Sequence, residues 1–204
     1  MMVSLEDLHN LAVFAMKNPP RNEKLLCEMF ANPPADTWNP AMNSSYSPYL
    51  SLAYHFCKRY RPPVVVELGL ENGRWCAAAC LASPSSCVTG VDIVDRISDH
   101  WTRWLMQCDN AHIRLCPSQW FLKCYDGPKI NLLHLDSSHE PDQTREEWEL
   151  IQPLMAPGGV ILMDDLETIG VGAVWKEITI PHVELKFLHP GGSYGAVVSL
   201  GGMY

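Results

Sequence analysis

Acidic side chains end four of the apolar runs that begin at residue 64. Glu67 and Asp92 close the first two runs, Asp136 closes the fourth, and the pair Asp164-Asp165 closes the fifth. Clustered carboxylates repel one another unless a cation neutralises them, so fold stability alone gives no reason for this arrangement. Hard oxygen ligands favour Mg2+, Ca2+ or Mn2+ over zinc. We therefore predict a divalent metal site at Asp136, Asp164 and Asp165, with Mg2+ as the expected ion.

Helix capping is the plainer explanation of the same acids. Aspartate is a preferred residue at helix N-termini, so Asp164 or Asp165 could cap the next helix while Asp136 bonds to backbone. The two explanations differ in one requirement. A metal site needs Asp136 to lie beside the other two carboxylates, whereas capping does not.

A histidine follows these acids closely. His139 comes after Asp136, in a loop that ends where Pro141 starts a helix. Imidazole exchanges protons near neutral pH, which suits a general base. A metal ion at the acids would coordinate a substrate hydroxyl and lower its pKa, and a base would then remove the proton. We predict His139 and Asp136 as catalytic residues; the alternative is a loop histidine that only caps or packs.

A loop with two glycines, E-L-G-L-E-N-G, follows the first run. Gly69 would let the chain turn tightly against a ligand, and Gly73 would let a helix begin close to the sheet. The spacing G-x-x-x-G differs from the dinucleotide pattern G-x-G-x-x-G, which disfavours a pyrophosphate ligand. Asp92 ends the next run, where a carboxylate can accept both hydroxyls of a ribose. Ser118 and Gln119 follow the third run and could reach an adenine edge, so the joint pattern predicts a cofactor site.

These side chains need a scaffold that brings several strand ends together. From residue 64 onward, β-branched or apolar runs alternate with helical patterns, which indicates a parallel sheet covered by helices on both faces. Ligands of such sheets bind beyond the carboxyl ends of the strands, where the acids lie. The expected strands cover 64–68, 88–92, 112–116, 130–136 and 160–165.

The two ends of the chain depart from this alternation. Helices are expected over 5–17, 22–30 and 47–60, so residues 1–61 should form a helical cap on a core of residues 62–204, within a single domain 1–204. Near the other end, two apolar runs flank P-G-G-S at 190–193, which is hairpin chemistry. We predict an α/β, Rossmann-like, doubly wound sheet of seven strands, mostly parallel, with an antiparallel C-terminal hairpin.

Charge and composition limit the partners. The chain has 204 residues and a net charge of −8, which disfavours a phosphate backbone as partner. No apolar run nears the roughly 18 residues of a membrane span, and the first residues do not resemble a signal peptide. The eight cysteines contain no C-x-x-C pair, as expected for free thiols in a reducing cytosol. We expect a cytoplasmic protein with a small-molecule substrate and no nucleic-acid or membrane partner; a homo-oligomer stays open.

The motifs together resemble the class I S-adenosylmethionine-dependent methyltransferases, which share E-L-G-x-x-x-G and an acid after the second strand. The run I-N-L-L-H-L-D-S-S-H, a long helix and then L-M-A-P-G-G-V-I-L-M-D-D are similar to a metal-dependent branch. That branch includes macrocin-type sugar O-methyltransferases and, more distantly, catechol O-methyltransferase. The resemblance covers roughly residues 62–200 and is most specific over 130–165. It implies S-adenosyl-L-methionine as cofactor and methyl transfer to a hydroxyl of a sugar, glycoside or other natural product.

The resemblance also assigns roles to individual residues. The cofactor would contact Glu67, Gly69 and Gly73 through its methionine part, Asp92 through its ribose, and Ser118 and Gln119 through adenine, with Asp136 beside it. The metal ligands would be Asp136, Asp164 and Asp165, and His139 would be the base.

One position departs from the pattern of this branch. Trp75 stands where relatives often have a small hydroxyl residue, and an indole there would reshape the methionine pocket. Two further functions therefore stay open. One is a metal-independent small-molecule methyltransferase, and the other is a non-catalytic relative that binds S-adenosylmethionine.

Overall fold

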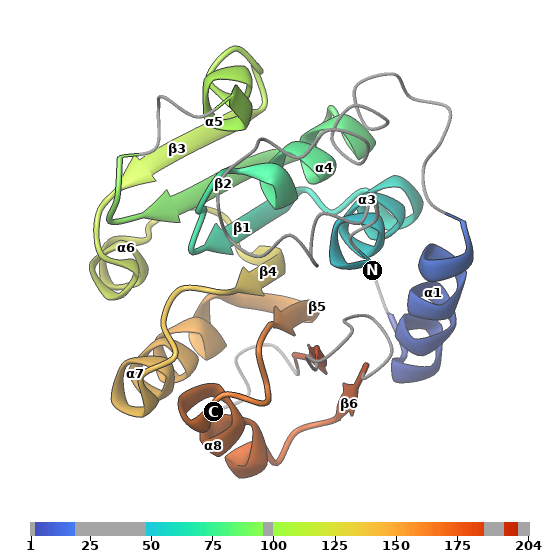
Figure 1. Cartoon of the computed structure of the whole chain (residues 1–204), viewed down its shortest axis with the longest axis vertical. Helices are drawn as coiled ribbons and strands as arrows, with labels where there is room; N and C mark the ends of the chain where they lie inside the picture. The colour runs from blue at the N-terminus through green and yellow to red at the C-terminus, as the bar shows by residue number, and fades with distance from the viewer. Residues whose placement is uncertain (1–2, 19–47, 96–99, 186–193, 200–204) are drawn as a thin grey trace, which may run out of the picture.

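A mixed sheet forms the centre of the computed structural model, which describes residues 3–18, 48–95, 100–185 and 194–199. Its seven strands run in the order β3-β2-β1-β4-β5-β7-β6 (Figure 1). β1 to β5 are parallel, and β7 pairs antiparallel with both β5 and β6. The strands are β1 Val64–Leu68, β2 Cys87–Asp92, β3 Ala111–Leu115, β4 Ile130–Leu135, β5 Met155–Met163, β6 His182–Glu184 and β7 Gly195–Val198. The predicted Rossmann-like sheet is confirmed, including its antiparallel C-terminal strands.

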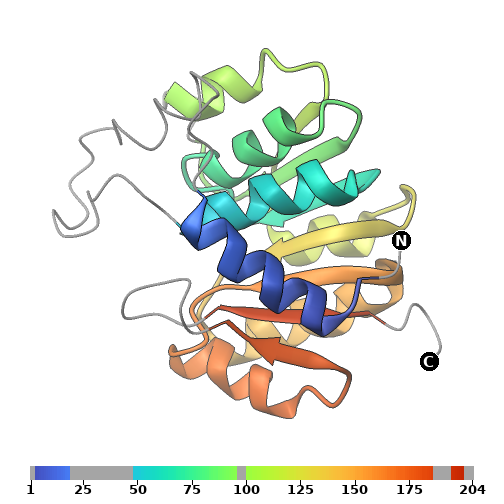
Figure 2. The same ribbon diagram turned by 90° about the vertical axis from the view of Figure 1, so that its right-hand side faces the viewer.

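Helices cover both faces of this sheet, as the continuous apolar strands predict. Along β1, Val65 packs with the helices of one face, whereas Val64 and Val66 pack with those of the other. Figures 1 and 2 show α1, α3 and α4 on the first side and α6, α7 and α8 on the second. The helices are α1 Leu5–Lys17, α3 Pro48–Tyr60, α4 Arg74–Ala82, α5 His100–Leu105, α6 Ser118–Cys124, α7 Pro141–Ile151 and α8 Ile169–Glu177.

The N-terminal helices follow their sequence signals closely. Ser4 caps α1 in a reciprocal capping box with Asp7, and the helix covers the predicted 5–17. α3 ends at Tyr60, just before the two prolines. α1 packs on α3, and α3 packs on α4 against the sheet. The helix expected over 22–30 and the loop at 32–47 lie outside the described residues, as does the P-G-G-S segment at 190–193.

β5 is longer than the sequence predicts. The strand begins at Met155, which pairs with Ile130, and not at Val160. The intervening residues, A-P-G-G, read as a turn, but they form an irregularity in the register between β4 and β5. Gly158 adopts a positive φ of 69° there, and its N–H donates to Ser199 O. Sheet pairing on both sides therefore outweighs the local turn preference.

None of the helices in the described part of the chain has the length and apolar character needed to span a bilayer.

Candidate active site

The loop between β1 and α4 lies directly against the end of β4. Gly69 has a φ of 91°, and the N–H groups of Gly69 and Leu70 both donate to Val91 O at the end of β2, at 2.9 and 3.1 Å. A Cβ on Gly69 would overlap the backbone of Asp136 and Ser137. Glycine is therefore required both by the left-handed turn and by the close approach of the two strand ends.

A cavity of about 280 Å³ opens beside this loop, beyond the carboxyl ends of β1, β2 and β4. Its position agrees with the ligand-binding edge expected of an open parallel sheet. Four of the predicted cofactor residues line it: Gly69, Asp92, Ser118 and Asp136. The cavity thus brings together residues from the ends of four different strands or the segments that follow them.

Asp92 ties two of these loops together. Its Oδ2 accepts the N–H of Glu71 at 2.8 Å, and its Oδ1 accepts the N–H of Val94 at 2.9 Å. Each carboxylate oxygen retains a further lone pair for a ligand hydroxyl. The side chain therefore shapes the cavity wall and can still accept hydrogen bonds from a bound diol.

Glu147 on α7 supports the opposite wall, and the sequence analysis missed it. This carboxylate is fully buried and accepts hydrogen bonds from Ser118 Oγ, from Ser137 Oγ at 2.7 Å and from Gln143 Nε2 at 3.1 Å. All three donors line the cavity. Glu147 thus fixes side chains from α6, the β4 loop and α7 without lining the cavity itself.

Three other predicted cofactor residues do not line this cavity. Glu67 lies within β1 with 2% of its surface exposed, and its Oε2 accepts the N–H of Cys76 at 3.1 Å. Gly73 is the N-cap of α4, with a φ of 79°. Gln119 lies in the first turn of α6. Trp75 is also buried, and its ring stacks on His134 at a centroid distance of 4.6 Å, so the indole does not obstruct the cavity.

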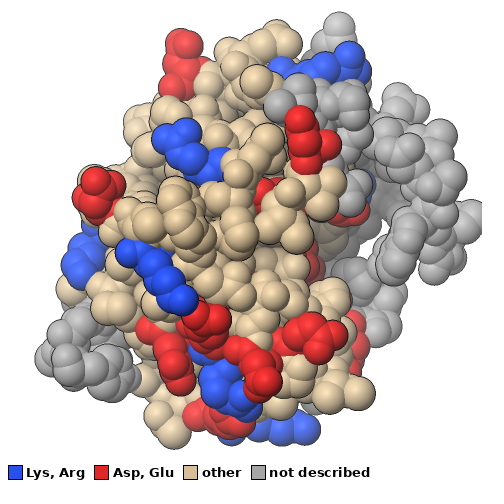
Figure 3. All heavy atoms as spheres, turned by 90° about the vertical axis from the view of Figure 1, so that its left-hand side faces the viewer, with Lys and Arg blue, Asp and Glu red and all other residues tan. Residues whose placement is uncertain are grey.

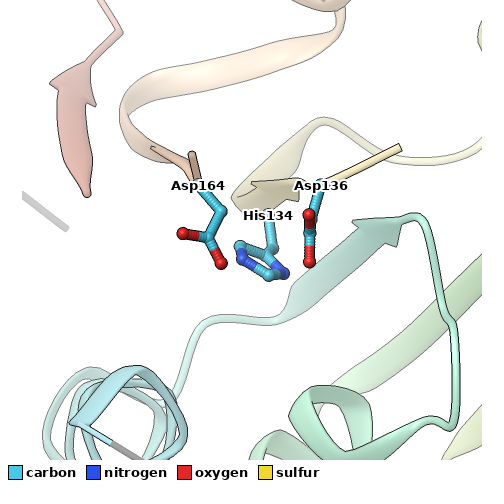
Figure 4. Close-up of side chains that lie close together, drawn as sticks. All are labelled: His134, Asp136 and Asp164. Carbon is cyan, nitrogen blue, oxygen red and sulfur yellow. The ribbon is translucent and has the colours of Figure 1, made fainter. Parts of the chain in front are cut away.

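Asp136 follows the end of β4, whereas Asp164 and Asp165 follow the end of β5 and belong to different groups of possible metal ligands. These strands are neighbours, with Leu135 paired to Met163, and the N–H of Asp164 donates to Leu135 O at 3.1 Å. One ligand atom from each of Asp136, His139 and Asp165 lies within 4.8 Å of the others. A second such group consists of His134, Asp136 and Asp164 (Figure 4). Asp136 belongs to both groups and so marks the centre of the site.

The environment of Asp136 disfavours its charge. Burial raises the pKa of Asp136 well above its usual range, and the nearby carboxylates of Asp164, Glu67 and Asp165 raise it further. A divalent cation would reverse this effect, because it stabilises the ionised form. The donor set, which consists of carboxylates and imidazoles around the partly buried Asp136, therefore fits a divalent metal ion.

Asp165 occupies a tight turn between β5 and α8. Its φ is 54°, a left-handed conformation that aspartate tolerates better than most residues, and its Oδ2 lies 3.0 Å from His139 Nε2. The N-cap of α8 is Thr168, whose hydroxyl donates to Asp165 O at 2.8 Å. Neither Asp164 nor Asp165 is therefore the residue that caps this helix.

The backbone of His139 is held by α8. A Cβ on Gly170, in the first turn of that helix, would overlap the carbonyl group of His139. The side chain of His139 is about half exposed, so solvent or a substrate can reach it. Gly170 was missed by the sequence analysis, because its spacing forms no recognisable motif with the His139 loop.

His134 is a third residue of the site that the sequence did not identify. The strand pattern predicts a packed histidine in β4, and 1% of its surface is exposed. Its partners, however, are polar: Nδ1 lies 3.1 Å from Glu67 Oε1. The signal in the sequence was a single histidine inside an otherwise apolar run, which alone does not distinguish packing from ligation.

Comparison with known proteins agrees with this geometry. A family model described as a methyltransferase domain matches residues 66–166, which contain the cavity loop, both histidines and all three acids. No curated protein sequence matches the chain significantly.

Solved structures of methyltransferases share this fold. The O-methyltransferase TomG from Streptomyces achromogenes, in complex with S-adenosylmethionine, superposes with a TM-score of 0.70 at 12% identity, covering 97% of this chain and 100% of TomG. An O-methyltransferase from Bacillus cereus, in complex with S-adenosylhomocysteine, superposes with a TM-score of 0.65 at 14% identity, covering 96% of this chain and 100% of the other. An rRNA methylase from Streptococcus thermophilus superposes with a TM-score of 0.60 at 15% identity, covering 74% of this chain and 96% of the other. At these identities the likeness establishes the fold, and the acceptor must be argued from the site.

Proposed function

We propose that this chain, which belongs to the methyltransferase-domain family, transfers the methyl group of S-adenosyl-L-methionine to a hydroxyl oxygen of a small molecule with the help of a divalent metal ion. The observation that carries the proposal is the position of Asp136. This residue lines the cavity beside the glycine loop and also belongs to both carboxylate–histidine groups. A methyl donor in the cavity and an oxygen held at the acids would therefore be neighbours.

The cavity wall suits the nucleoside half of the cofactor. Asp92 has lone pairs left for the two ribose hydroxyls, and Ser118 and Gln143 stand at the wall that Glu147 supports. Gly69 keeps the loop free of a side chain, so a ligand can approach its backbone. The volume of about 280 Å³ is near the lower end of the usual range for ligand pockets, ~300 to 1,000 Å³.

The acids suit the acceptor half of the reaction. Asp136 could share a divalent ion with Asp164 or with Asp165, because it belongs to a carboxylate–histidine group with each of them, and Mg2+ is one ion that such ligands accept. When bound, the cofactor supplies a methyl group on a sulfonium, and the metal ion lowers the pKa of a coordinated hydroxyl. The protein contributes mainly by holding the acceptor oxygen in line with the methyl carbon, since orientation accounts for a large part of such rates.

His139 is the proposed base. Its Nε2 lies 3.0 Å from Asp165 Oδ2, which orients the ring and leaves Nδ1 as the atom that accepts the hydroxyl proton. The half-exposed side chain can reach a substrate from the solvent side of the site. Asp165 would also stabilise the imidazolium that forms.

A small acceptor fits the surface better than a nucleic acid does. Figure 3 shows Lys and Arg side chains scattered among acidic ones on the face formed by α6, α7 and α8. Lys123 pairs with Glu146 at 2.6 Å, and Arg145 pairs with Glu177 at 3.0 Å. With a net charge of −8, such a face gives little attraction to a phosphate backbone. A sugar, glycoside or other hydroxylated natural product is the proposed acceptor class.

Calorimetry followed by a transfer assay tests this proposal. S-adenosylhomocysteine should bind at a single site, and methyl transfer from labelled S-adenosylmethionine to a panel of catechols and glycosides should stop on chelation and return with Mg2+ or Mn2+. Failure of S-adenosylhomocysteine to bind would contradict the cofactor assignment. Full activity after chelation would leave a metal-independent methyltransferase as the better description.

A further inference from the structure

A buried imidazole lies between two of the acids at the centre of the site. His134 is 1% exposed, and one of its ring nitrogens lies within 4.8 Å of carboxylate oxygens of Asp136 and Asp164. Figure 4 shows the imidazole lying between the two carboxylates, each of which follows the end of its own strand. The stacked ring of Trp75, 4.6 Å away and 9° from parallel, restrains the orientation of the imidazole.

Glu67 determines which ring nitrogen of His134 carries a proton. The Glu67 carboxylate is almost fully buried, and its Oε1 lies 3.1 Å from His134 Nδ1. A carboxylate accepts hydrogen bonds, so Nδ1 is the donor, and a neutral ring then presents a lone pair at Nε2. Histidines that bind metal ions are commonly held in this way, with the second nitrogen donating to a carboxylate or carbonyl.

Nε2 of His134 is buried, and no described residue forms a hydrogen bond with it. The hydroxyl of Tyr194 and the indole nitrogen of Trp75 are also buried beside the imidazole. The Tyr194 ring lies 5.7 Å from the imidazole, and the Trp75 ring stacks on its face. A buried polar atom is costly to leave without a partner, so the unpaired Nε2 of His134 beside two carboxylates points to a ligand at this position.

We propose that His134, Asp136 and Asp164 bind a divalent transition-metal ion through one imidazole nitrogen and two carboxylates. The inference rests on the proposed function and sharpens it, because it names the ligands and the class of ion. Imidazole suits transition-metal ions such as Fe2+ and carboxylates suit Mn2+, whereas Mg2+ takes oxygen ligands almost exclusively. This assignment chooses Asp164 over Asp165 as the second carboxylate ligand and leaves Asp165 to orient His139, so one acid pair holds the ion and the third acid serves the base.

Pulsed electron paramagnetic resonance of the Mn2+-loaded protein tests the proposal directly, because it detects a nitrogen bonded to the ion. Wild type and His139→Ala should both show nitrogen coupling, and His134→Phe, whose ring can still stack on Trp75, should not. Calorimetry should show Mn2+ binding more tightly than Mg2+ in wild type. Glu67→Gln leaves His134 in place but replaces the carboxylate that accepts a hydrogen bond from its Nδ1 with a neutral amide. This variant should bind Mn2+ roughly tenfold more weakly.

The outcomes separate this inference from the proposed function. Mn2+ bound without nitrogen coupling in wild type, or coupling lost only in His139→Ala, would overturn the His134 site and leave a metal-dependent methyltransferase in place. Absence of any divalent-ion binding, with S-adenosylhomocysteine still bound, would overturn both the site and the metal dependence. If His134→Phe does not fold, as judged by circular dichroism, the wild-type and His139→Ala spectra decide the question.

Discussion

His139 is the residue whose replacement most directly tests the chemistry. Its ring is about half exposed and contacts Asp165 at 3.0 Å, outside the cavity beside Gly69. His139→Ala should lower kcat by about 10²- to 10⁴-fold, the usual contribution of a general base. Affinity for S-adenosylhomocysteine should be unchanged, because the side chain does not line the cavity. Steady-state kinetics and calorimetry measure the two quantities, and an unaltered kcat would remove His139 from the mechanism.

Glu147 offers a second test, on the cofactor side. Glu147→Gln places an amide N–H toward three hydrogen-bond donors and leaves at least one of them unsatisfied, at a cost of about 1–3 kcal/mol. We expect S-adenosylhomocysteine binding to weaken by about tenfold or more, which corresponds to at least ~1.4 kcal/mol.

The matched control for this variant is Glu146→Gln on the same helix. Glu146 is partly exposed and forms a surface ion pair with Lys123, so its replacement should alter neither binding nor stability measurably. Calorimetry and thermal unfolding of both variants separate a role in binding from general destabilisation. A Glu147→Gln protein that melts earlier but binds the ligand normally would make Glu147 purely structural.

The sequence predicts the acids better than it predicts the residues that support them. Asp136 and Asp164 follow the ends of strands, and parallel neighbouring strands bring their ends together, so their proximity follows from the pattern alone. Glu147 reads as one more acid on the polar face of a helix. Its burial depends on how α7 packs against α6, which no local pattern encodes. The same holds for His134, whose period-two position predicts burial but not its partner Glu67.

The close packing of α8 against the His139 loop makes the loop sensitive to any side chain at Gly170. Gly170→Ala would push a methyl group into the carbonyl group of His139, and a rigid backbone must then shift. Displacing a base can cost about 10²-fold in rate, so kcat should fall by that order while S-adenosylhomocysteine still binds. Ile169→Ala changes the neighbouring, 88% exposed side chain and should leave kcat unaltered. Equal kcat values for the two variants would show that the loop tolerates the shift.

The packing of α1 on α3 should depend on pH through His55. Its Nε2 lies 2.7 Å from Asn18 O at the end of α1, and its ring meets Phe14 at 5.1 Å. Burial lowers the pKa of His55, and Lys58 adds to this effect, against the opposing hydrogen bond to Asn18. The unfolded chain, with an ordinary histidine pKa of about 6.5, then binds more protons. The stability that His55 contributes is therefore present above that value and is lost as the pH falls below it.

Urea unfolding at about pH 7.5 and about pH 5.5, on either side of the ~6.5 reference value, measures this effect. The free energy of unfolding should fall between the two conditions in wild type, and it should fall less in His55→Gln, which cannot take up a proton. Equal losses in the two proteins would assign the pH dependence to other groups.

The sequence predicts the bounds of a helix or strand well where the local sequence signals agree. α1 matches 5–17 because a capping box and an apolar stripe agree, and β1 matches 64–68 because prolines precede it and a glycine loop follows. The start of β5 was wrong, since P-G-G favours a turn locally while strands β4 and β7 impose extended pairing. Long-range pairing of this kind cannot be read from a short window of sequence.

The order of the strands explains why the protein would hold two positive charges, the sulfonium of the cofactor and the divalent metal ion, close together. β1 lies between β2 and β4, and β5 follows β4, so the cavity loop, Asp136 and Asp164 occupy one continuous edge of the sheet. Asp136 lines the cofactor cavity and also belongs to the possible metal site. A positive charge in the cofactor cavity therefore acts on the metal site, and the reverse, because both sites share the Asp136 carboxylate. Away from bulk water, such Coulomb interactions are stronger.

This arrangement predicts a coupling between the metal ion and the charge of the cofactor. S-adenosylmethionine carries a sulfonium and S-adenosylhomocysteine does not, so a divalent ion at the acids should weaken the former relative to the latter. A repulsion of about 1 kcal/mol would change the ratio of the two dissociation constants about fivefold. By reciprocity, S-adenosylmethionine should weaken Mn2+ binding by the same factor relative to S-adenosylhomocysteine. Calorimetry with both ligands, with and without Mn2+, measures this ratio, and a ratio independent of the metal ion would place the two sites too far apart for a shared reaction.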